Sequence, residues 1–327
     1  HAWYLSKAVE ALRYIPPGEA ERVIPQVRKW LREPAVAGIV AAQAYELMKK
    51  LAQESSTAAL SIFHGLTLPV PKDEVPSRRI GLPGEAACKF GAAWNKDKVL
   101  TEGLQLLWDL NISEVVEILE NHLCTALKIE ALARDEPDFQ FSSWWRTAVE
   151  ETGQDSYRAY RDELLAALRD TVEIWVKRDA SSVEPLLQRY LRERHQILRR
   201  VGFHVLHRFP TQYVAHVVKE LHKVENLSDA GIHHEFFLLL EQGYPLLDTE
   251  DQRSLVAFIC KGPPPEHTQA LAEWAQEQRG ADPVEYADFY SKRWTRDRLW
   301  MIRDHLARRP AQLLQELVSE LGEPEHP

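Results

Sequence analysis

Residues 213–224 have the sequence YVAHVVKELHKV and carry the clearest structural pattern in the chain. Their apolar side chains recur at steps of three and four, which places them on one side of an α-helix. These apolar positions are Tyr213, Val214, Val217, Val218, Leu221 and Val224. Because most of the stability of such a helix comes from packing its apolar side, we predict that this helix lies on neighbouring helices.

Similar helices are predicted on both sides of this stretch. Pro210 ends the preceding helix, Ser228 or Asp229 caps the following one, and Gly262 with the prolines at 263–265 ends another. Successive helix starts lie about 14 to 19 residues apart, so that a pair of helices takes about 30 to 40 residues. This spacing is typical of helical-hairpin repeats of the HEAT and TPR kind. We therefore predict an all-α fold, an irregular α-solenoid.

The pattern divides the chain into three parts. Residues 1–65 are predicted to form N-terminal helical hairpins, and residues 99–327 a helical-repeat array. Residues 66–98 show little helical periodicity and are predicted to be a loop or a short extended insert. The prolines and glycines of this insert are Pro69, Pro71, Pro76, Gly81, Pro83, Gly84 and Gly91.

Composition excludes several classes of protein. The chain has 327 residues, of which 45% are hydrophobic and 27% charged, so it is expected to fold around a core. Glycine numbers only 14, against about 23 at average usage, which disfavours β-rich folds and glycine-rich phosphate loops. The formal net charge of −9 disfavours a dedicated nucleic-acid coat protein.

Cellular location is indicated by several features. Cys88, Cys124 and Cys260 are isolated in sequence, as expected of reduced thiols in the cytoplasm. There is no apolar run of the roughly 18 to 20 residues that spans a bilayer and no secretory leader, so we expect no membrane partner. The chain starts with His1 rather than Met, and we expect it to be part of a longer protein.

Histidine is the most suggestive catalytic residue type. His204 and His207 lie three residues apart on one predicted helix, and His233 and His234 lie on another, so a metal-dependent hydrolase is one alternative. However, His234-Glu235 is not followed by the second histidine of an H-E-x-x-H motif. The phosphate-loop G-x-x-x-x-G-K-S/T, G-x-G-x-x-G and G-x-S-x-G motifs are also absent. We therefore predict no enzyme activity, no metal and no cofactor.

Two stretches of positive charge interrupt the acidic background. The first contains Arg189, Arg192, Arg194, Arg199, Arg200, Arg208, Lys219 and Lys223, and the second contains Lys292, Arg293, Arg296, Arg298, Arg303, Arg308 and Arg309, with Trp294 and Trp300 interleaved. Arginine and tryptophan together are typical of protein interfaces. We predict a protein-binding site at Arg192, Arg199, Arg200, Trp294, Arg298 and Trp300. Single-stranded nucleic acid is the alternative, because arginine contacts phosphate and tryptophan stacks on bases.

Several short segments resemble a known family. They are RYLRERHQILRR at 189–200, HEFFLLL at 234–240, KGP at 261–263, WTRDRLW at 294–300 and GEPEHP at 322–327. This region, roughly residues 180–327, is similar to the C-terminal helical repeats of bacterial STAND-type NTPases, including Avs-type antiviral defence proteins. The resemblance implies a sensor that captures a phage protein and triggers oligomerisation. The P-loop ATPase of that family would lie outside this chain, which lacks its motif, and no catalytic residue transfers.

Overall fold

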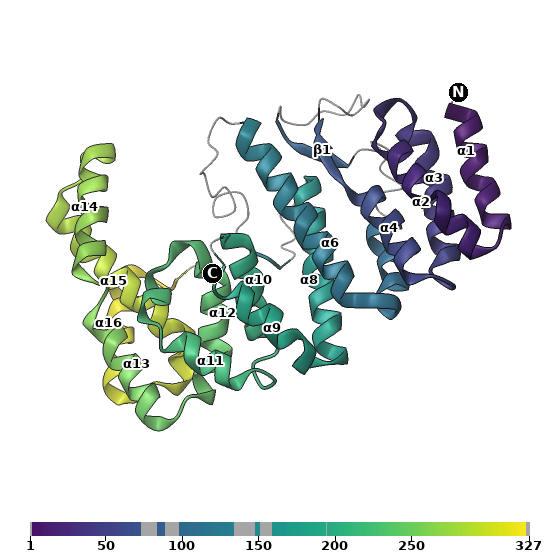
Figure 1. The fold of residues 1–327 in the computed structure, drawn as a ribbon. Coiled ribbons are helices and arrows are strands. Elements are labelled where there is room, and N and C mark those ends of the chain that lie inside the picture. The colour runs from purple at the N-terminus through teal and green to yellow at the C-terminus, as the bar shows by residue number, and fades with distance from the viewer. Residues whose placement is uncertain are drawn as a thin grey trace. The chain divides into compact units, whose positions relative to one another are not determined.

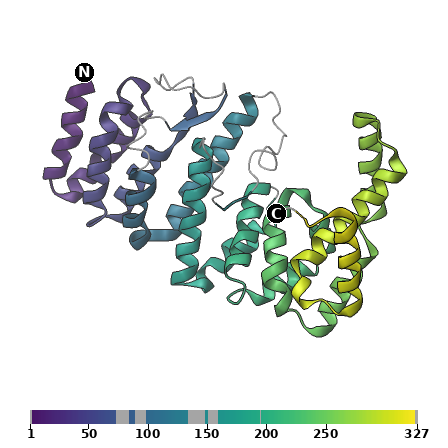
Figure 2. The ribbon, with the colours of Figure 1, turned by 180° about the vertical axis from the view of Figure 1, so that it is seen from behind.

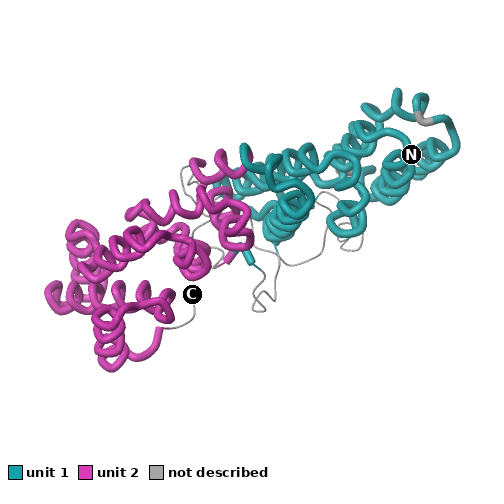
Figure 3. Tube along the Cα trace, turned by 90° about the horizontal axis from the view of Figure 1, so that it is seen from below, with its two compact units in different colours: residues 1–145, 149–185 teal, residues 146–148, 186–327 magenta. Residues whose placement is uncertain are grey.

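A computed structural model describes residues 2–72, 84–88, 98–133, 148–150, 159–193 and 195–324. The predicted all-α fold is confirmed, and the α-solenoid stays a prediction. The chain divides into two compact units, unit 1 with residues 1–145 and 149–185 and unit 2 with residues 146–148 and 186–327 (Figure 3). This division lies inside the range 99–327, which the sequence predicted as one array. No helix in the described ranges is long and apolar enough to cross a bilayer.

Unit 1 is a stack of helices with one small sheet (Figure 1). Its elements are α1 (Ala2–Ala11), η1 (Leu12–Tyr14), α2 (Pro17–Arg32), α3 (Pro34–Leu51), α4 (Ser56–Thr67), β1 (Pro69–Pro71), β2 (Ala86–Cys88), η3 (Val99–Gly103), α6 (Leu104–Ala133), α8 (Tyr160–Arg178) and α9 (Ala180–Tyr190), which continues into unit 2. Helix α3 packs on α1, α2 and α4, and α6 packs on α4 and α8. A kink divides α6 at Asn111, whose backbone is extended and whose Oδ1 accepts a hydrogen bond from the Glu114 N–H. Asn111 therefore caps the second part of the helix.

The predicted insert contains a short antiparallel hairpin. Strands β1 and β2 pair with Pro69 opposite Cys88 and Pro71 opposite Ala86. The hairpin lies against α6, and β2 also contacts α8. Proline cannot donate to a neighbouring strand, which suits Pro69 and Pro71 to the edge strand of a two-stranded sheet. Of the two predicted alternatives, a loop or a short extended insert, residues 69–71 and 86–88 form the extended one, while 73–83 and 89–97 lie outside the described residues.

Unit 2 is built around α12 and α15. Its elements are α10 (Gln196–Arg208), α11 (Val214–Leu221), η4 (Val224–Ser228), η5 (Ala230–Ile232), α12 (His233–Gly243), η6 (Tyr244–Leu246), α13 (Thr249–Lys261), α14 (Pro265–Arg279), α15 (Pro283–Met301), η7 (Arg303–His305) and α16 (Arg308–Leu321). Helix α12 packs on α10, α11 and α15, and α15 packs on α13, α14 and α16 (Figure 2). Aspartates begin two of these helices, because Asp248 and Asp282 each accept two backbone N–H groups at the start of α13 and α15.

The apolar stripe at 213–224 is only partly buried. Tyr213, Val217 and Leu221 are buried, as predicted for a helix that lies on its neighbours. Val214 and Val224, in contrast, are both 40% exposed. Helix α11 ends at Leu221 and η4 begins at Val224, so the predicted periodicity does not extend to the last position.

Gly243 allows α12 to approach α11 closely, and its replacement is a test of this packing. A Cβ at Gly243 would lie 2.6 Å from Val217 Cγ1 and 3.1 Å from Leu221 Cδ1. Because Val217 is buried and β-branched, it has little room to move. We expect Gly243→Ala to lower the free energy of unfolding by about 1–3 kcal/mol in urea denaturation. Gly18→Ala is the control, because nothing lies within 4 Å of its Cβ position; an equal loss there would contradict the explanation.

Candidate functional site

Three of the residues predicted to bind a partner are buried. Arg200, Trp294 and Arg298 are 3%, 2% and 5% exposed. The prediction that these side chains form a binding surface is therefore wrong, because the packing of α10, α12 and α15 encloses them. Their positive charges and aromatic rings contact other parts of unit 2 instead.

Arg200 forms a buried ion pair with Glu235. The Arg200 Nε donates to Glu235 Oε2 at 2.8 Å, and Nη2 donates to Oε1 at 2.9 Å. Glu235 is 0% exposed, so both charges are removed from water. The two parallel hydrogen bonds match the planar guanidinium to the planar carboxylate. This pair joins the second turn of α10 to the first turn of α12 and thereby fixes how the two helices pack.

Arg199 contacts the segment between α11 and α12. Its Nη1 donates to Asp229 Oδ2 at 2.5 Å, and its Nη2 donates to Asn226 Oδ1 at 2.7 Å. The Asn226 amide in turn donates to the Glu220 backbone oxygen at 3.1 Å. The guanidinium of Arg199, which is half-buried, thus holds η4 and η5 on α10.

Arg298 contacts the same segment from α15. Its Nε donates to the Leu227 backbone oxygen at 2.8 Å, and Nη2 donates to the same oxygen. Its guanidinium lies 4.0 Å from the centroid of the Trp294 ring and 5.0 Å from that of Phe237. Burial lowers the pKa of Arg298 to about 9. A charge that is solvated by a carbonyl and two aromatic faces stabilises the packing and is not available to a partner.

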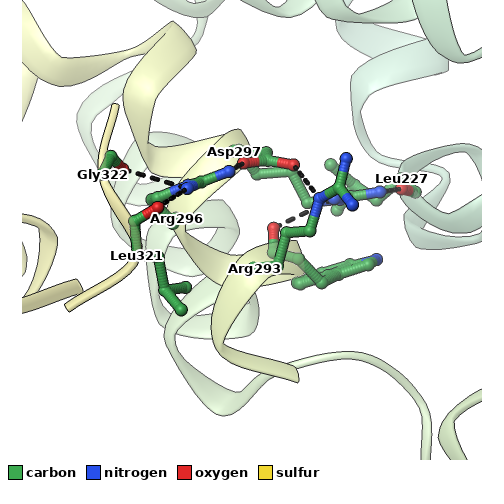
Figure 4. Close-up of polar contacts among 8 residues, drawn as sticks. Leu227, Arg293, Arg296, Asp297, Leu321 and Gly322 are labelled. Atoms are coloured by element: carbon green, nitrogen blue, oxygen red, sulfur yellow. Dashed lines mark hydrogen bonds and ion pairs between the residues drawn. The ribbon is translucent and has the colours of Figure 1, made fainter. Parts of the chain in front are cut away.

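The second basic stretch contains a further internal network (Figure 4). Arg296 Nη1 donates to the backbone oxygens of Leu321 and Gly322 at 3.1 and 2.9 Å. Its Nη2 donates to Asp297 Oδ1 at 2.6 Å, and Asp297 Oδ2 lies 3.7 Å from Arg293 Nε. Carbonyls at the end of a helix have no partner within the helix. Arg296 therefore stabilises the end of α16 on α15.

The remaining predicted residues are more accessible. Arg192 is exposed and Trp300 is half-buried. The Arg303 guanidinium lies 4.9 Å from the centroid of the Trp300 ring. Because Arg199, Arg200, Arg296 and Arg298 are used inside unit 2, the basic surface required by the nucleic-acid alternative is reduced. Arg194 lies outside the described residues.

The histidines of the metal alternative are also placed by the fold. His204 and His207 lie one turn apart on α10, with ring centroids 5.6 Å apart. His233 instead lies against Phe237, at 3.9 Å between ring centroids, and burial together with nearby Arg298 lowers its pKa to about 4. In the described part of unit 2, neither His233 nor His234 joins His204 and His207 in a group of three possible ligands. The predicted set of four therefore does not form one site.

Sequence reasoning missed the exposed apolar side chains near the turn between α14 and α15. Trp274 is 44% exposed, Val284 76% and Phe289 47%. All three lie within about two to three helical turns of Gly280, which ends α14 with φ +65°. In α14 only Ala272 and Ala275 are buried, although Trp274 and Leu271 are larger. In the sequence, the alternation of large apolar residues with alanines in this helix is the pattern that could have indicated exposed apolar side chains.

These residues belong to an acidic, projecting part of unit 2, which we call the acidic arm (residues 265–291). Helix α14 packs mainly on α15 and extends away from the other helices of unit 2 (Figures 1 and 2). The arm has six exposed acidic side chains, Glu266, Glu273, Glu277, Asp282, Glu285 and Asp288. Its one basic side chain, Arg279, lies 5.1 Å from the centroid of the Trp274 ring. The arm therefore presents apolar groups within a negative surface.

Unit 1 contains a buried polar cluster at the end of α4. The Thr67 hydroxyl donates to the Phe63 backbone oxygen at 2.9 Å and lies 3.0 Å from His122 Nδ1. Since the single hydroxyl hydrogen is already used, the Nδ1–H of His122 donates to Thr67. The Tyr160 hydroxyl donates to the Thr67 backbone oxygen at 2.6 Å. The last turn of α4 is thus joined to α6 and α8.

His122 is held in its neutral form. Its ring is 2% exposed and lies 4.6 Å from that of His64. Burial, together with the neighbouring His64, lowers the pKa of His122 to about 3. Burial, Arg28 and Arg32 also lower the pKa of His64. Among the described groups none is a hydrogen-bond partner of His122 Nε2, so the cluster favours two uncharged rings.

Comparison with known proteins finds no similar chain. No family model matches it. No curated protein and no solved structure matches it either. The geometry of the described residues therefore carries the functional argument.

Loss of Arg200 should destabilise the protein far more than loss of an exposed arginine. We expect Arg200→Ala to lower the free energy of unfolding by about 3–5 kcal/mol, because Glu235 is left as a buried charge without its bidentate partner. Arg192→Ala, at an exposed position, should change it by less than about 0.5 kcal/mol. Urea denaturation measures both. A small effect of Arg200→Ala would contradict the role assigned to the pair.

Acidification should destabilise the fold through His122. The unfolded histidine has a pKa of about 6.5 and binds a proton that the folded one, with its lowered pKa, does not. Stability is therefore complete above about pH 6.5 and falls at lower pH, by about 2 kcal/mol between about pH 7 and pH 5 for this group. His122→Asn should remove that part of the pH dependence in denaturation curves. His267→Asn, at an exposed position, is the control and should leave the change of unfolding free energy with pH as in the wild type. If His122→Asn also shows the wild-type pH dependence, His122 is not its source.

Proposed function

We propose that this chain is a non-catalytic helical module that binds another protein through the acidic arm. The observation that carries the proposal is the exposure of Trp274, Val284 and Phe289 at one end of a pair of helices. Aromatic side chains are enriched at protein interfaces and often carry much of the binding energy. Exposed apolar groups within a polar surround are typical of such interfaces.

The weak packing of α14 supports the same proposal. Most helices in water are stabilised by the tertiary packing of an apolar face. Helix α14 has 15 residues and buries two alanines. A partner that covers Trp274 and the half-buried Leu271 would supply the packing that α14 does not obtain from α15.

The resemblance to STAND-type NTPases suggests a specific form of this function. Residues 180–327 would be the sensor part of an antiviral defence ATPase, and the arm would contact the captured phage protein. The charge of the arm favours a protein over nucleic acid, because six acidic side chains against one basic side chain repel phosphate. This form of the proposal accounts for the absence of catalytic motifs in the chain.

A quantitative affinity capture tests the proposal. The wild-type chain, Trp274→Ala/Phe289→Ala and Trp300→Ala are used as baits in lysate of phage-infected bacteria, and the captured proteins are quantified by mass spectrometry. We expect some proteins to be captured equally by the wild type and by Trp300→Ala. The amount of these proteins captured by the double variant should be at least about tenfold lower, a factor typical of removing interface aromatics. Circular dichroism checks that all three baits are folded. Identical captures by all three would exclude the arm as the binding surface.

A further inference from the structure

Both helices of the acidic arm have an exposed aromatic side chain, Trp274 on α14 and Phe289 on α15. In unit 2 the central helix α12 packs on three helices, α10, α11 and α15, whereas α14 packs mainly on α15. Trp274 on α14 and Phe289 on α15 lie at similar distances, about 8–9 Å along the helix axes, from the turn at Gly280. A further helix that lies on the arm near Gly280 would place its side chains between those of α14, because the ridges of one helix fit the grooves of another.

The charges on the arm indicate the chemistry of that helix. Glu273 and Glu277 lie one turn apart on α14, on either side of Trp274 in the sequence. On α15, Glu285 lies one turn before Phe289, whereas the carboxylate of Asp288 is paired with Lys292 at 2.8 Å. Arg279 is the arm's only Lys or Arg, and its guanidinium lies over the Trp274 ring. Complementary charge steers association and excludes partners of the wrong sign. An occupant with lysine or arginine beside an apolar stripe fits this surface.

We infer that the acidic arm binds an amphipathic helix of a partner protein, with an apolar stripe that covers Trp274 and Phe289 and with basic side chains that face Glu273, Glu277 and Glu285. This inference rests on the proposed function and adds the structure and charge of the bound segment. A helix satisfies its own backbone hydrogen bonds, so its side chains supply the contacts. Such binding uses anchors at steps of three and four.

Two synthetic peptides test the inference with the full chain. Each has about 18 residues, enough for five turns, with leucine at helical steps of three and four. One has lysine on the polar face and the other glutamate, and both are labelled and used below the concentration at which they self-associate. In fluorescence anisotropy we expect the lysine peptide to bind at least about tenfold more tightly, with an affinity that falls as salt rises. Equal affinities for the two peptides would overturn the inference.

Charge reversal locates the binding. Glu273→Lys/Glu277→Lys should weaken binding of the lysine peptide at least about tenfold and strengthen binding of the glutamate peptide. Glu316→Lys, at an exposed position on α16, is the control and should change neither affinity more than about twofold. A photoreactive benzophenone side chain at position 289 should crosslink to the lysine peptide. If reversal at Glu273 and Glu277 has no more effect than Glu316→Lys, the arm is not the site.

The two proposals can fail separately. In one outcome, capture of a protein requires Trp274 and Phe289 but the two peptides bind with equal affinity. The arm then binds a protein of another kind, and only the amphipathic-helix inference is wrong. If the lysine peptide binds at the arm but no captured protein depends on the arm, the inference about its chemistry stands and the proposed function falls.

Discussion

The buried ion pair between Arg200 and Glu235 is the interaction on which the packing of unit 2 depends. It joins α10 to α12 with two hydrogen bonds in a place that water does not reach. Removing either partner would leave a charge in the interior, which costs far more than the pair contributes when intact. The neighbouring Arg199 and the distant Arg298 hold η4 between α10 and α15. The hydrogen bonds of arginine are directional and fix the relative position of two helices more specifically than contacts of leucine and valine do.

This internal use of arginine changes where a binding surface can be. The two basic stretches supply internal hydrogen bonds, whereas the acidic arm supplies exposed apolar groups and excess negative charge. The chain as a whole has a formal charge of −9, and the arm, with six acidic side chains and one basic one, contributes more than half of it. A partner would therefore encounter a negative, partly apolar surface near Trp274, and the proposed function follows from that surface.

Unit 1 is held at the end of α4 by uncharged groups. Thr67 is contacted by His122 from α6 and by Tyr160 from α8, and the histidine rings stay neutral because burial disfavours their charged form. In unit 2, by contrast, Arg200 and Glu235 form a buried ion pair. The first arrangement makes stability sensitive to pH below about 6.5, and the second makes it sensitive to loss of either partner.

The sequence alone determined the all-α class and the helix boundaries near Pro210, Asp229 and Gly262. These features depend on backbone chemistry that is local in the chain. The sequence left open whether the insert around Pro69 and Pro71 is a loop or an extended segment. Burial of Arg200, Trp294 and Arg298, and exposure of Trp274 and Phe289, were decided only by the tertiary structure. A charged or aromatic residue has the same local pattern whether its helix face meets solvent or another helix. Which face is covered depends on residues far away in sequence, as when Glu235 meets Arg200.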